Sequence, residues 1–215
     1  MSKADASFPA LPAHAGPAPV AGAAIASVEC QTKVAHVVLT LQPGGLERLV
    51  CDLALSSREA GIAALVCCLD TDGVLADGLR RSGIDVRVIR RNAGLDPGLF
   101  LRLARFFRQE GVTVVHTHGP DPMFYGGWGA WLAGVRTRVH TQHDTMLETS
   151  SWRERFKFRL AAPAFDDVVA VSGKTHEIVA RYRAGGCRLS TIPNGIDAMR
   201  AKMANASLAC ILFPM

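Results

Sequence analysis

The stretch that decides the fold is Val112–Pro120, whose sequence in one-letter code is VTVVHTHGP. Its β-branched residues favour an extended strand, and the glycine and proline that follow mark a turn. We therefore predict a buried strand over Val112–His116, with His118 at the start of the loop behind it. Its polar side chains come at its carboxyl end, which is where ligands bind in parallel sheets.

Six more segments of this kind occur along the chain. They are Val34–Leu39, Ile62–Leu69, Ile84–Ile89, Arg138–Gln142, Asp167–Val171 and Leu189–Ile192. Segments of helical length separate most of them. Near-continuous apolar strands that alternate with helices are typical of a parallel sheet covered on both faces. The predicted fold class is α/β: a Rossmann-like, doubly wound parallel sheet of about seven strands in a single domain.

Two of the predicted helices are the best defined. The first, Leu46–Ala60, has an apolar stripe, and the second begins at Asp96, which we expect to cap it, followed by Pro97. In the second helix, the side chains expected to face the core are Leu99, Leu103, Phe106 and Phe107. Those expected to face solvent are Arg102, Arg105 and Arg108.

Composition excludes several function classes. The 215 residues are 49% hydrophobic, which is enough for a substantial core, and carry a net charge of +5. This mild positive charge suits a nucleotide diphosphate or an acidic membrane surface, and it is too weak and too evenly spread to indicate nucleic acid. The six cysteines contain no Cys-x-x-Cys pair, so we expect free thiols in a reducing cytoplasm.

The first 32 residues differ in composition from the rest. Residues 6–28 hold no Asp, Glu, Lys or Arg, and prolines interrupt a run that is largely Ala and Gly. We expect a disordered leader over residues 1–32, and neither a signal peptide nor a membrane span. The predicted location is cytoplasmic, with peripheral contact at the inner membrane face as an alternative.

Gly44 and Gly45 stand directly before the first predicted helix. They let a ligand approach the backbone closely, and the start of the helix presents free N–H groups that suit phosphate. The loop lacks the Gly-x-Gly-x-x-Gly pattern, which disfavours a dinucleotide site. A plain tight turn is the alternative interpretation.

Four histidines lie at the ends of neighbouring predicted strands: His116, His118, His140 and His143. Alternation along a strand places His116 and His118 on the same side. A metal site is one interpretation, and hydrogen bonding to sugar hydroxyls or to strand ends is the other. Because no carboxylate or thiolate stands at ligand spacing, we predict no metal. A metal-dependent hydrolase built on the four histidines is the last of the alternatives.

A basic and aromatic segment, Ser151–Phe165, follows the fifth predicted strand. Trp152, Phe156 and Leu160 recur there at helical spacing. Four cationic residues stand beside them: Arg153, Arg155, Lys157 and Arg159. One interpretation is a helix that docks on a membrane surface. The favoured alternative packs the three apolar side chains on the sheet while the charges face water.

Taken together, these features resemble the N-terminal domain of the family-four retaining glycosyltransferases of the GT-B fold. The resemblance covers roughly residues 33–197. The matching motifs are Gly44-Gly45 with Glu47, His116-Thr117-His118, Val171-Ser172 before a helix that Ser172 would cap, and Pro193-Asn194-Gly195-Ile196-Asp197. No single motif is specific, and their order and spacing along one alternating domain carry the match.

The resemblance implies a role for each matched residue. Gly44 and Gly45 would lie against the donor diphosphate, and His118 would stand by the reacting sugar as the catalytic residue. The acceptor and the cleft between two domains would be lined by Glu47, His116, His143, Asn194 and Gly195. The reaction would transfer a sugar from a nucleotide-sugar to a glycan or lipid-linked acceptor, with retention of configuration and without a bound metal or other cofactor.

The resemblance also implies a second, donor-binding domain. Residues 198–215 do not continue the family pattern, and we expect them to be a non-family tail in place of that domain. We therefore expect the chain alone to be inactive, because a departing diphosphate needs fixed positive charge in a closed cleft. A separately encoded donor domain is one alternative, and a non-catalytic binding module or truncated relic is the other. The face meant for a second domain would favour self-association.

Overall fold

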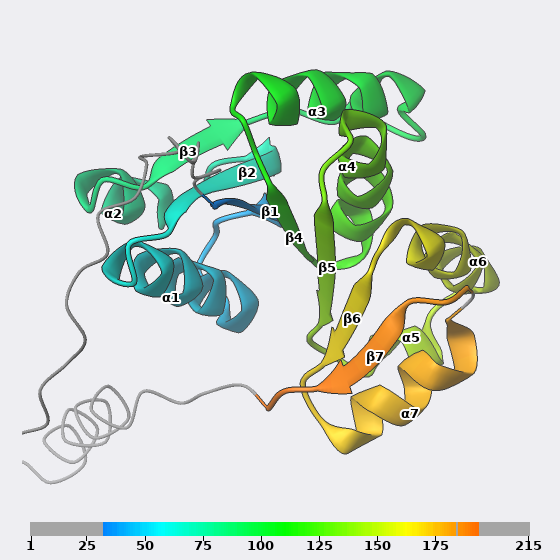
Figure 1. Ribbon diagram of the computed structural model, residues 1–215. Helices are drawn as coiled ribbons and strands as arrows, with labels where there is room; N and C mark the ends of the chain where they lie inside the picture. The colour runs from blue at the N-terminus through cyan, green and yellow to red at the C-terminus, as the bar shows by residue number, and fades with distance from the viewer. Residues whose placement is uncertain (1–31, 184, 194–215) are drawn as a thin grey trace, which may run out of the picture. The chain divides into compact units, whose positions relative to one another are not determined.

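In the computed structural model the described residues are 32–183 and 185–193, and they form one seven-stranded parallel sheet (Figure 1). The strand order is β3-β2-β1-β4-β5-β6-β7. The strands are β1 (Lys33–Thr40), β2 (Ala63–Thr71), β3 (Asp85–Val88), β4 (Val114–His118), β5 (Thr137–Gln142), β6 (Asp167–Ala170) and β7 (Arg188–Thr191). The predicted parallel sheet of about seven strands is confirmed.

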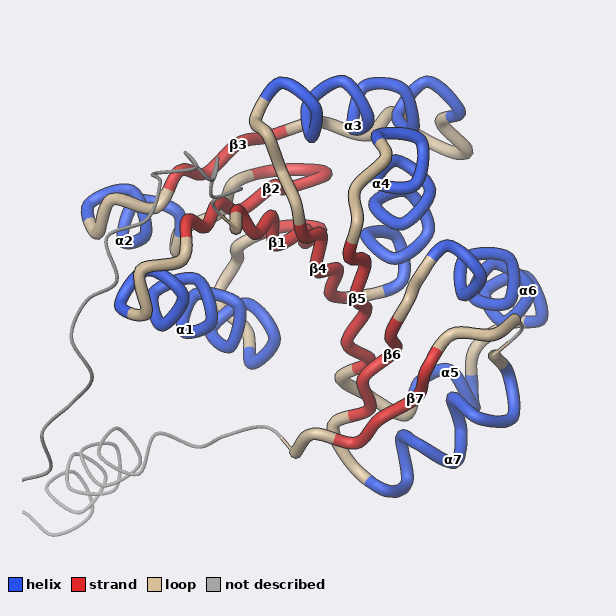
Figure 2. The backbone as a smooth tube through the Cα atoms, in the orientation of Figure 1, coloured by secondary structure: helices blue, strands red, loops and turns tan. Residues whose placement is uncertain are grey.

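Helical segments connect the strands (Figure 2). The longer ones are α1 (Gly45–Glu59), α3 (Pro97–Gln109), α6 (Trp152–Ala161) and α7 (Gly173–Tyr182). The shorter ones are α2 (Ala76–Arg81), α4 (Gly127–Ala133) and α5 (Met146–Thr149). A π-helical turn, η1 (Pro122–Gly126), leads into α4, and a 3-10 turn, η2 (Ala162–Ala164), follows α6.

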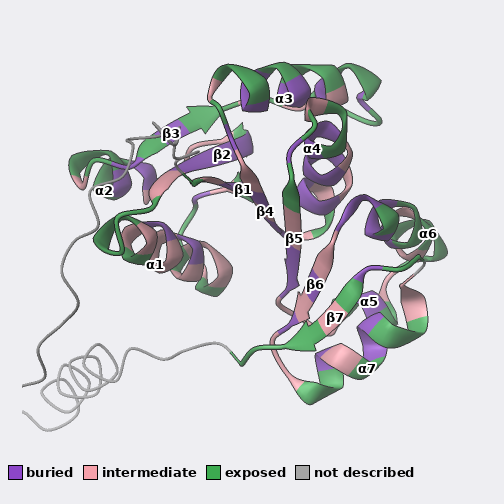
Figure 3. Ribbon diagram, in the orientation of Figure 1, coloured by how far each residue is buried: buried purple, intermediate pink, exposed green. Residues whose placement is uncertain are grey.

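Different helices cover the two faces of the sheet, and the strands between them carry the buried core (Figure 3). On β1, Val38 packs in a cluster with Val50 of α1, whereas Val37 packs in one with Leu103 of α3. Neighbouring residues of one strand therefore reach opposite faces, as pleating requires. α1 and α2 lie on one face, and α3, α4, α6 and α7 lie on the other, so the sheet is doubly wound as predicted.

The side chains of α3 divide as predicted. Its buried residues include Leu99, Leu103, Phe106 and Phe107, and its exposed ones include Arg102, Arg105 and Arg108. Asp96 stands at the N-cap position with Pro97 in the first turn, as predicted, but its side chain makes no capping hydrogen bond. The carboxylate of Asp96 instead accepts hydrogen bonds from the Asn92 N–H at 2.9 Å and from Arg102 at 2.7 Å, and so anchors the loop before α3.

β4 begins and ends later than predicted. The N–H of Val112 donates to the carbonyl oxygen of Phe107 at 2.9 Å, so Val112 closes the end of α3 and lies outside the strand. The strand then extends through His118. His118 is therefore the last residue of the strand rather than the first of the loop, and its ring direction is set by the pleat.

Glycines bring α4 close to its neighbours. A Cβ on Gly127 would lie 2.5 Å from the ring of Phe165, and one on Gly129 would lie 2.8 Å from Leu103 of α3. Both distances are below van der Waals contact. The inner face of α4 is therefore made of small residues, and the large side chains of its sequence, Trp128 and Trp131, take other directions.

α6 turns its aromatic stripe, defined as Trp152, Phe156 and Leu160, outward. These side chains are 70%, 54% and 46% exposed, and Phe158 and Ala161 face the core instead. The favoured expectation that the stripe packs on the sheet is wrong. No helix within residues 32–183 and 185–193 has the length and apolar content needed to cross a membrane.

Candidate functional site

The loop after β1 presents the start of α1. Gly44 is extended, with φ near −160°, and no side chain caps the helix that follows. A Cβ on Gly45 would meet no atom within 4 Å, so the first turn of α1 is open on that side. The carboxylate of Glu47 lies over Gly44, where a Cβ would stand 2.2 Å from its Oε2. The partial positive charge of the helix start thus already holds an anionic group of this chain.

Gly73, in the turn after β2, fixes the loop after β1. Its φ is +67°, and an added Cβ would lie 2.4 Å from the backbone carbon of Leu41. The N–H of Leu75 also donates to the Leu41 carbonyl oxygen at 3.1 Å. Only glycine fits this position, because both the left-handed backbone and the close approach exclude a side chain.

A histidine cluster, defined as His36, His116, His118 and His143, lies beside β1 and β4, towards the carboxyl end of β4. His36 and His116 are paired residues of β1 and β4, and His118 follows two residues along β4, so all three project from one face. The ring centroids of His116 and His118 are 4.1 Å apart. His36 was not among the site residues predicted from the sequence. The strand order 3-2-1-4, usual for such sheets, is the signal that would have placed it beside His116.

Hydrogen bonds join the cluster. His36 Nδ1 lies 3.4 Å from His118 Nε2, and His118 Nδ1 lies 3.0 Å from His143 Nε2. His116 Nε2 lies 2.8 Å from the hydroxyl of Thr141, a residue of β5 that the sequence analysis missed. Both ring nitrogens of His118 are therefore engaged, which fixes its orientation.

His140 lies on the opposite face of the sheet, so the four histidines of the metal alternative do not form one group. Val37, Thr117, His140 and Val168 are paired in one row across β1, β4, β5 and β6, and this row faces α3 and α6. His140 Nδ1 lies 3.0 Å from the Thr117 hydroxyl, and its ring contacts Phe165. It is a hydrogen-bonded core residue.

Burial keeps the histidines neutral. It lowers the pKa of His36 and of His140 to about 4. It lowers the pKa of His116 and His118 well below the usual 6.5, with a further contribution from the neighbouring imidazoles. A neutral imidazole has one donor and one acceptor, so His36, His118 and His143 form a chain in which every hydrogen bond runs in the same direction.

The segment after His118 is held by Gly119 and Asp121. Gly119 has a φ of +94°, which turns the chain at once, and its carbonyl oxygen accepts a hydrogen bond from Met123 N–H at 2.9 Å. Asp121, at the start of η1, forms ion pairs with Lys157 of α6 and, at 3.5 Å, with Arg91. Sequence reasoning missed Asp121, whose contacts tie η1 to α6.

Of the two remaining motifs, only the one at Ser172 lies within the described residues. Ser172 caps α7 as predicted, since its hydroxyl accepts a hydrogen bond from Thr175 N–H at 3.1 Å. Asn194 and Gly195 lie outside the described residues, as do the predicted leader over residues 1–32, apart from residue 32, and the predicted tail over residues 198–215.

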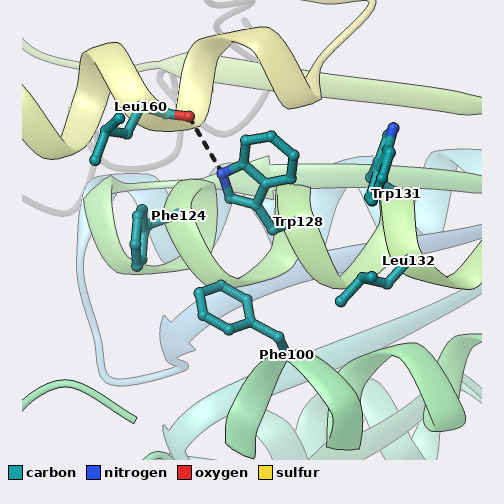
Figure 4. A pocket seen from close by; sticks show the side chains of 6 residues that line it. All are labelled: Phe100, Phe124, Trp128, Trp131, Leu132 and Leu160. Carbon is teal, nitrogen blue, oxygen red and sulfur yellow. Dashed lines mark hydrogen bonds between the residues drawn. The ribbon is translucent and has the colours of Figure 1, made fainter. Parts of the chain in front are cut away.

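An aromatic groove of about 400 Å³ lies between α3, α4 and α6 (Figure 4). It is lined by Phe100, Phe124, Trp128, Trp131, Leu132 and Leu160. The indole N–H of Trp128 donates to the Leu160 carbonyl oxygen at 3.2 Å, which joins α4 to α6 across the groove. Trp131 is 53% exposed. Through Leu160 the groove is continuous with the aromatic stripe of α6.

These features define the class of protein. A seven-stranded parallel sheet of this order has the fold of the N-terminal, Rossmann-like domain of GT-B glycosyltransferases. The family model described as Glycosyltransferase Family 4 matches residues 43–200, and the chain belongs to that family.

Relatives extend over about twice the matched length. A UDP-Gal:alpha-D-GlcNAc-diphosphoundecaprenol alpha-1,3-galactosyltransferase of Escherichia coli is 28% identical over an alignment of 186 residues that covers 80% of this chain and 46% of that protein. HepE of Anabaena, solved with UDP and glucose, has a TM-score of 0.61 at 20% identity, over 82% of this chain and 50% of that one. A glycosyltransferase of Rickettsia africae has a TM-score of 0.61 at 19% identity, over 84% and 48%. The two structures support the fold alone, and the chain spans about half the length of the curated relative.

Proposed function

We propose that residues 33–197 are the acceptor-side domain of a retaining glycosyltransferase that moves a hexose from a UDP-sugar to a glycan or lipid-linked acceptor. Family membership supports sugar transfer, and the name of the Escherichia coli relative supports the class of donor and acceptor. The observation that carries the proposal is the position of His118, which ends β4 at the carboxyl edge of the sheet.

His118 is the proposed catalytic residue. Its ring is only 1% exposed and is held between His36 and His143. His143 is only half-buried, so a sugar hydroxyl can take its place at His118 Nδ1 when the His143 side chain rotates away. A neutral His118 then accepts or donates a hydrogen bond to that hydroxyl. His116 and His143 shape the acceptor side, as we propose also for Asn194 and Gly195.

The proposed donor-phosphate site is the open turn at Gly44 and Gly45. The Glu47 carboxylate lies over Gly44, so an arriving diphosphate displaces it and takes over the start of α1. The donor diphosphate therefore has to replace the Glu47 carboxylate before it can bind at the start of α1. Because several further positive contacts are needed to stabilise a departing diphosphate, we propose that transfer also needs a donor-binding domain beyond residues 33–197.

Contact with a membrane surface fits the same acceptor class. The aromatic stripe of α6 is exposed, and so are Arg153 and Arg159 of the same helix, whereas Arg155 and Lys157 contact Tyr182 and Asp121. Exposed aromatic side chains with cationic neighbours bind the interface of an anionic bilayer. We propose that the stripe and the aromatic groove rest on the bilayer that holds the acceptor lipid.

Acceptor binding and transfer are measured separately. Vesicles with and without an undecaprenyl-diphosphate-linked GlcNAc are floated with the purified chain, and transfer from UDP-galactose is followed by label in the lipid fraction. We expect the acceptor to raise vesicle binding, His118→Ala to abolish that increase, and no transfer by the chain alone. Transfer by the chain alone would overturn the need for a donor domain. Equal binding to both vesicles would overturn the acceptor role.

A non-catalytic binding module is the second candidate, because the Glu47 carboxylate already lies over Gly44 at the proposed donor-phosphate site. A chimera separates the two functions: residues 33–197 replace the matching half of the Escherichia coli relative. Restored transfer that His118→Ala removes supports the enzyme half. Acceptor binding without transfer supports the module.

A further inference from the structure

Three imidazoles of the histidine cluster converge on one point. His36, His116 and His118 each offer one ring nitrogen, and these three atoms all lie within 4.8 Å of one another. They come from the middle of β1 and the end of β4, two adjacent strands at the centre of the sheet. The backbone that carries them is therefore rigid, which is what a binding site needs in order to hold a fixed geometry.

The spacing within the cluster matches a shared ion. His36 Nδ1 and His118 Nε2 are 3.4 Å apart, which is long for a hydrogen bond with a nitrogen donor. Two nitrogens that each lie about 2.0–2.1 Å from one tetrahedral Zn²⁺ are about 3.4 Å apart. The pair therefore has the separation of two ligands of one ion.

The outer nitrogens of His118 and His116 have the partners that metal-bound histidines use. His118 Nδ1 lies 3.0 Å from His143 Nε2, and His116 Nε2 lies 2.8 Å from the Thr141 hydroxyl. In metal sites, the ring N–H that faces away from the ion donates to such a neighbour and fixes the ring. With Nε2 of His116 engaged by Thr141, its Nδ1 is left to the ion.

We propose that His36, His116 and His118 form a three-histidine site for a borderline transition-metal ion of the Zn²⁺ class. Three imidazoles suit Zn²⁺, Co²⁺, Ni²⁺ or Cu²⁺ and not Mg²⁺ or Ca²⁺, which prefer oxygen ligands. Three protein ligands leave the fourth tetrahedral position open to water or to a substrate oxygen. The proposal stands on these contacts, and the metal site shares His116 and His118 with the proposed sugar-transfer site.

His36 changes the expectation drawn from sequence. The absence of a metal was predicted from the histidines of β4 and β5 alone. The structure removes His140 from that group and adds His36, a residue only 3% exposed whose Nδ1 lies 3.4 Å from His118 Nε2.

Cobalt is the probe for the test, because its absorption spectrum reports both geometry and ligand type. The purified full-length chain is titrated with Co²⁺, and Zn²⁺ then displaces it. We expect one equivalent to bind with visible bands of a four-coordinate ion and without thiolate-to-cobalt charge transfer in the near ultraviolet. Charge-transfer bands would assign the ion to cysteines and overturn the proposal, as would the absence of saturable binding.

Variants locate the site. His36→Leu keeps the size and burial of the side chain and removes one ligand, so we expect at least a hundredfold weaker Co²⁺ binding. His176→Asn, which changes a histidine of α7 that bonds to Thr191, is the matched control and should bind as the wild type does. Unchanged affinity in a folded His36→Leu chain would overturn the proposal.

A second, more conservative variant tests the site in case His36→Leu does not fold. Thr141→Val preserves shape and removes the oxygen that orients His116. If the site is as proposed, Co²⁺ affinity falls about 10- to 100-fold, which is the usual cost of losing a group that orients a metal ligand. If Thr141→Val binds Co²⁺ as the wild type does, His116 is not a ligand and the three-histidine site is wrong.

Discussion

The histidine cluster and the aromatic groove depart in opposite ways from the usual distribution of side chains. The cluster buries polar rings, with His36 and His118 only 3% and 1% exposed, whereas Trp131 beside the groove is 53% exposed. Burying polar groups and exposing large apolar ones both work against folding stability. We propose binding roles for both regions, and each has a different weakness: the cluster is sensitive to protons and the groove to loss of apolar area.

The largest expected difference between the two regions is their response to low pH, because acid charges the buried histidines and leaves the groove unchanged. The pKa of His36 and His140 is about 4 in the fold and about 6.5 in the unfolded chain, so both stabilise the fold above pH 6.5. That stability is lost as the pH falls from 6.5 towards 4. We expect a loss of about 2 kcal/mol for each by pH 5.

Urea unfolding at pH 7.5 and pH 5 measures this loss. His140→Gln, which removes one buried imidazole on the face away from the cluster, should flatten the pH dependence by about half of the combined effect of His36 and His140. A stability that is constant between the two pH values would contradict the burial of neutral histidines.

Two phenylalanines on α6 provide the next comparison. Phe158 is 6% exposed and Phe156 is 54% exposed. Phe158→Ala should lower the free energy of unfolding by about 3–5 kcal/mol, since it leaves a cavity in the core. Phe156→Ala should change it by less than about 0.5 kcal/mol. Chemical denaturation of both variants is the measurement, and equal losses would mean that α6 packs with the other face inward.

The aromatic stripe is exposed, so its side chains can be replaced with little expected loss of folding stability. We expect Trp152→Ser with Phe156→Ser to weaken binding to anionic vesicles about tenfold or more, because each side chain contributes apolar area at the bilayer interface. Flotation at low salt measures the binding. Arg153→Gln with Arg159→Gln is the companion variant, and its effect should shrink as salt is added. Wild-type protein that stays unbound at low salt would rule out this use of the stripe.

The smallest expected effect concerns Glu47. Glu47→Gln removes the negative charge that lies over Gly44 at the start of α1, so UDP or pyrophosphate should bind about two- to fivefold more tightly. Glu59→Gln, at the far end of the same helix, is the matched control. Calorimetry with pyrophosphate gives the affinities, and weaker binding in Glu47→Gln would show that Glu47 helps to hold the ligand.

Local sequence predicted the strands well because a fully buried parallel strand is a run of apolar, β-branched residues. It also placed His116 and His118 on one side, since that relation needs only the pleat of a single strand. The register between strands depends on the turns and on the helices that join them. The pairing of Thr117 with His140, which sends His140 to the opposite face, therefore has no local signal.

The orientation of α6 was missed for a related reason. Trp152, Phe156 and Leu160 form one apolar stripe, and Phe158 with Ala161 forms another. Periodicity shows that a helix has an apolar stripe, but two stripes leave the choice of the inner one to packing. Here the core accepts Phe158 against Ala162 and Phe165, which belong to the same buried cluster.

The glycines of α4 have a consequence for how the protein tolerates change. In this helix the smallest residues face inward and the tryptophans face the groove. The size of a side chain therefore does not predict how much its substitution costs in stability. In a saturation scan, a single methyl group at Gly127 or Gly129 would be more damaging than the loss of the whole indole at Trp131. Residues on the surface next to the groove can therefore be substituted freely, whereas Gly127 and Gly129 beneath it cannot accept a side chain.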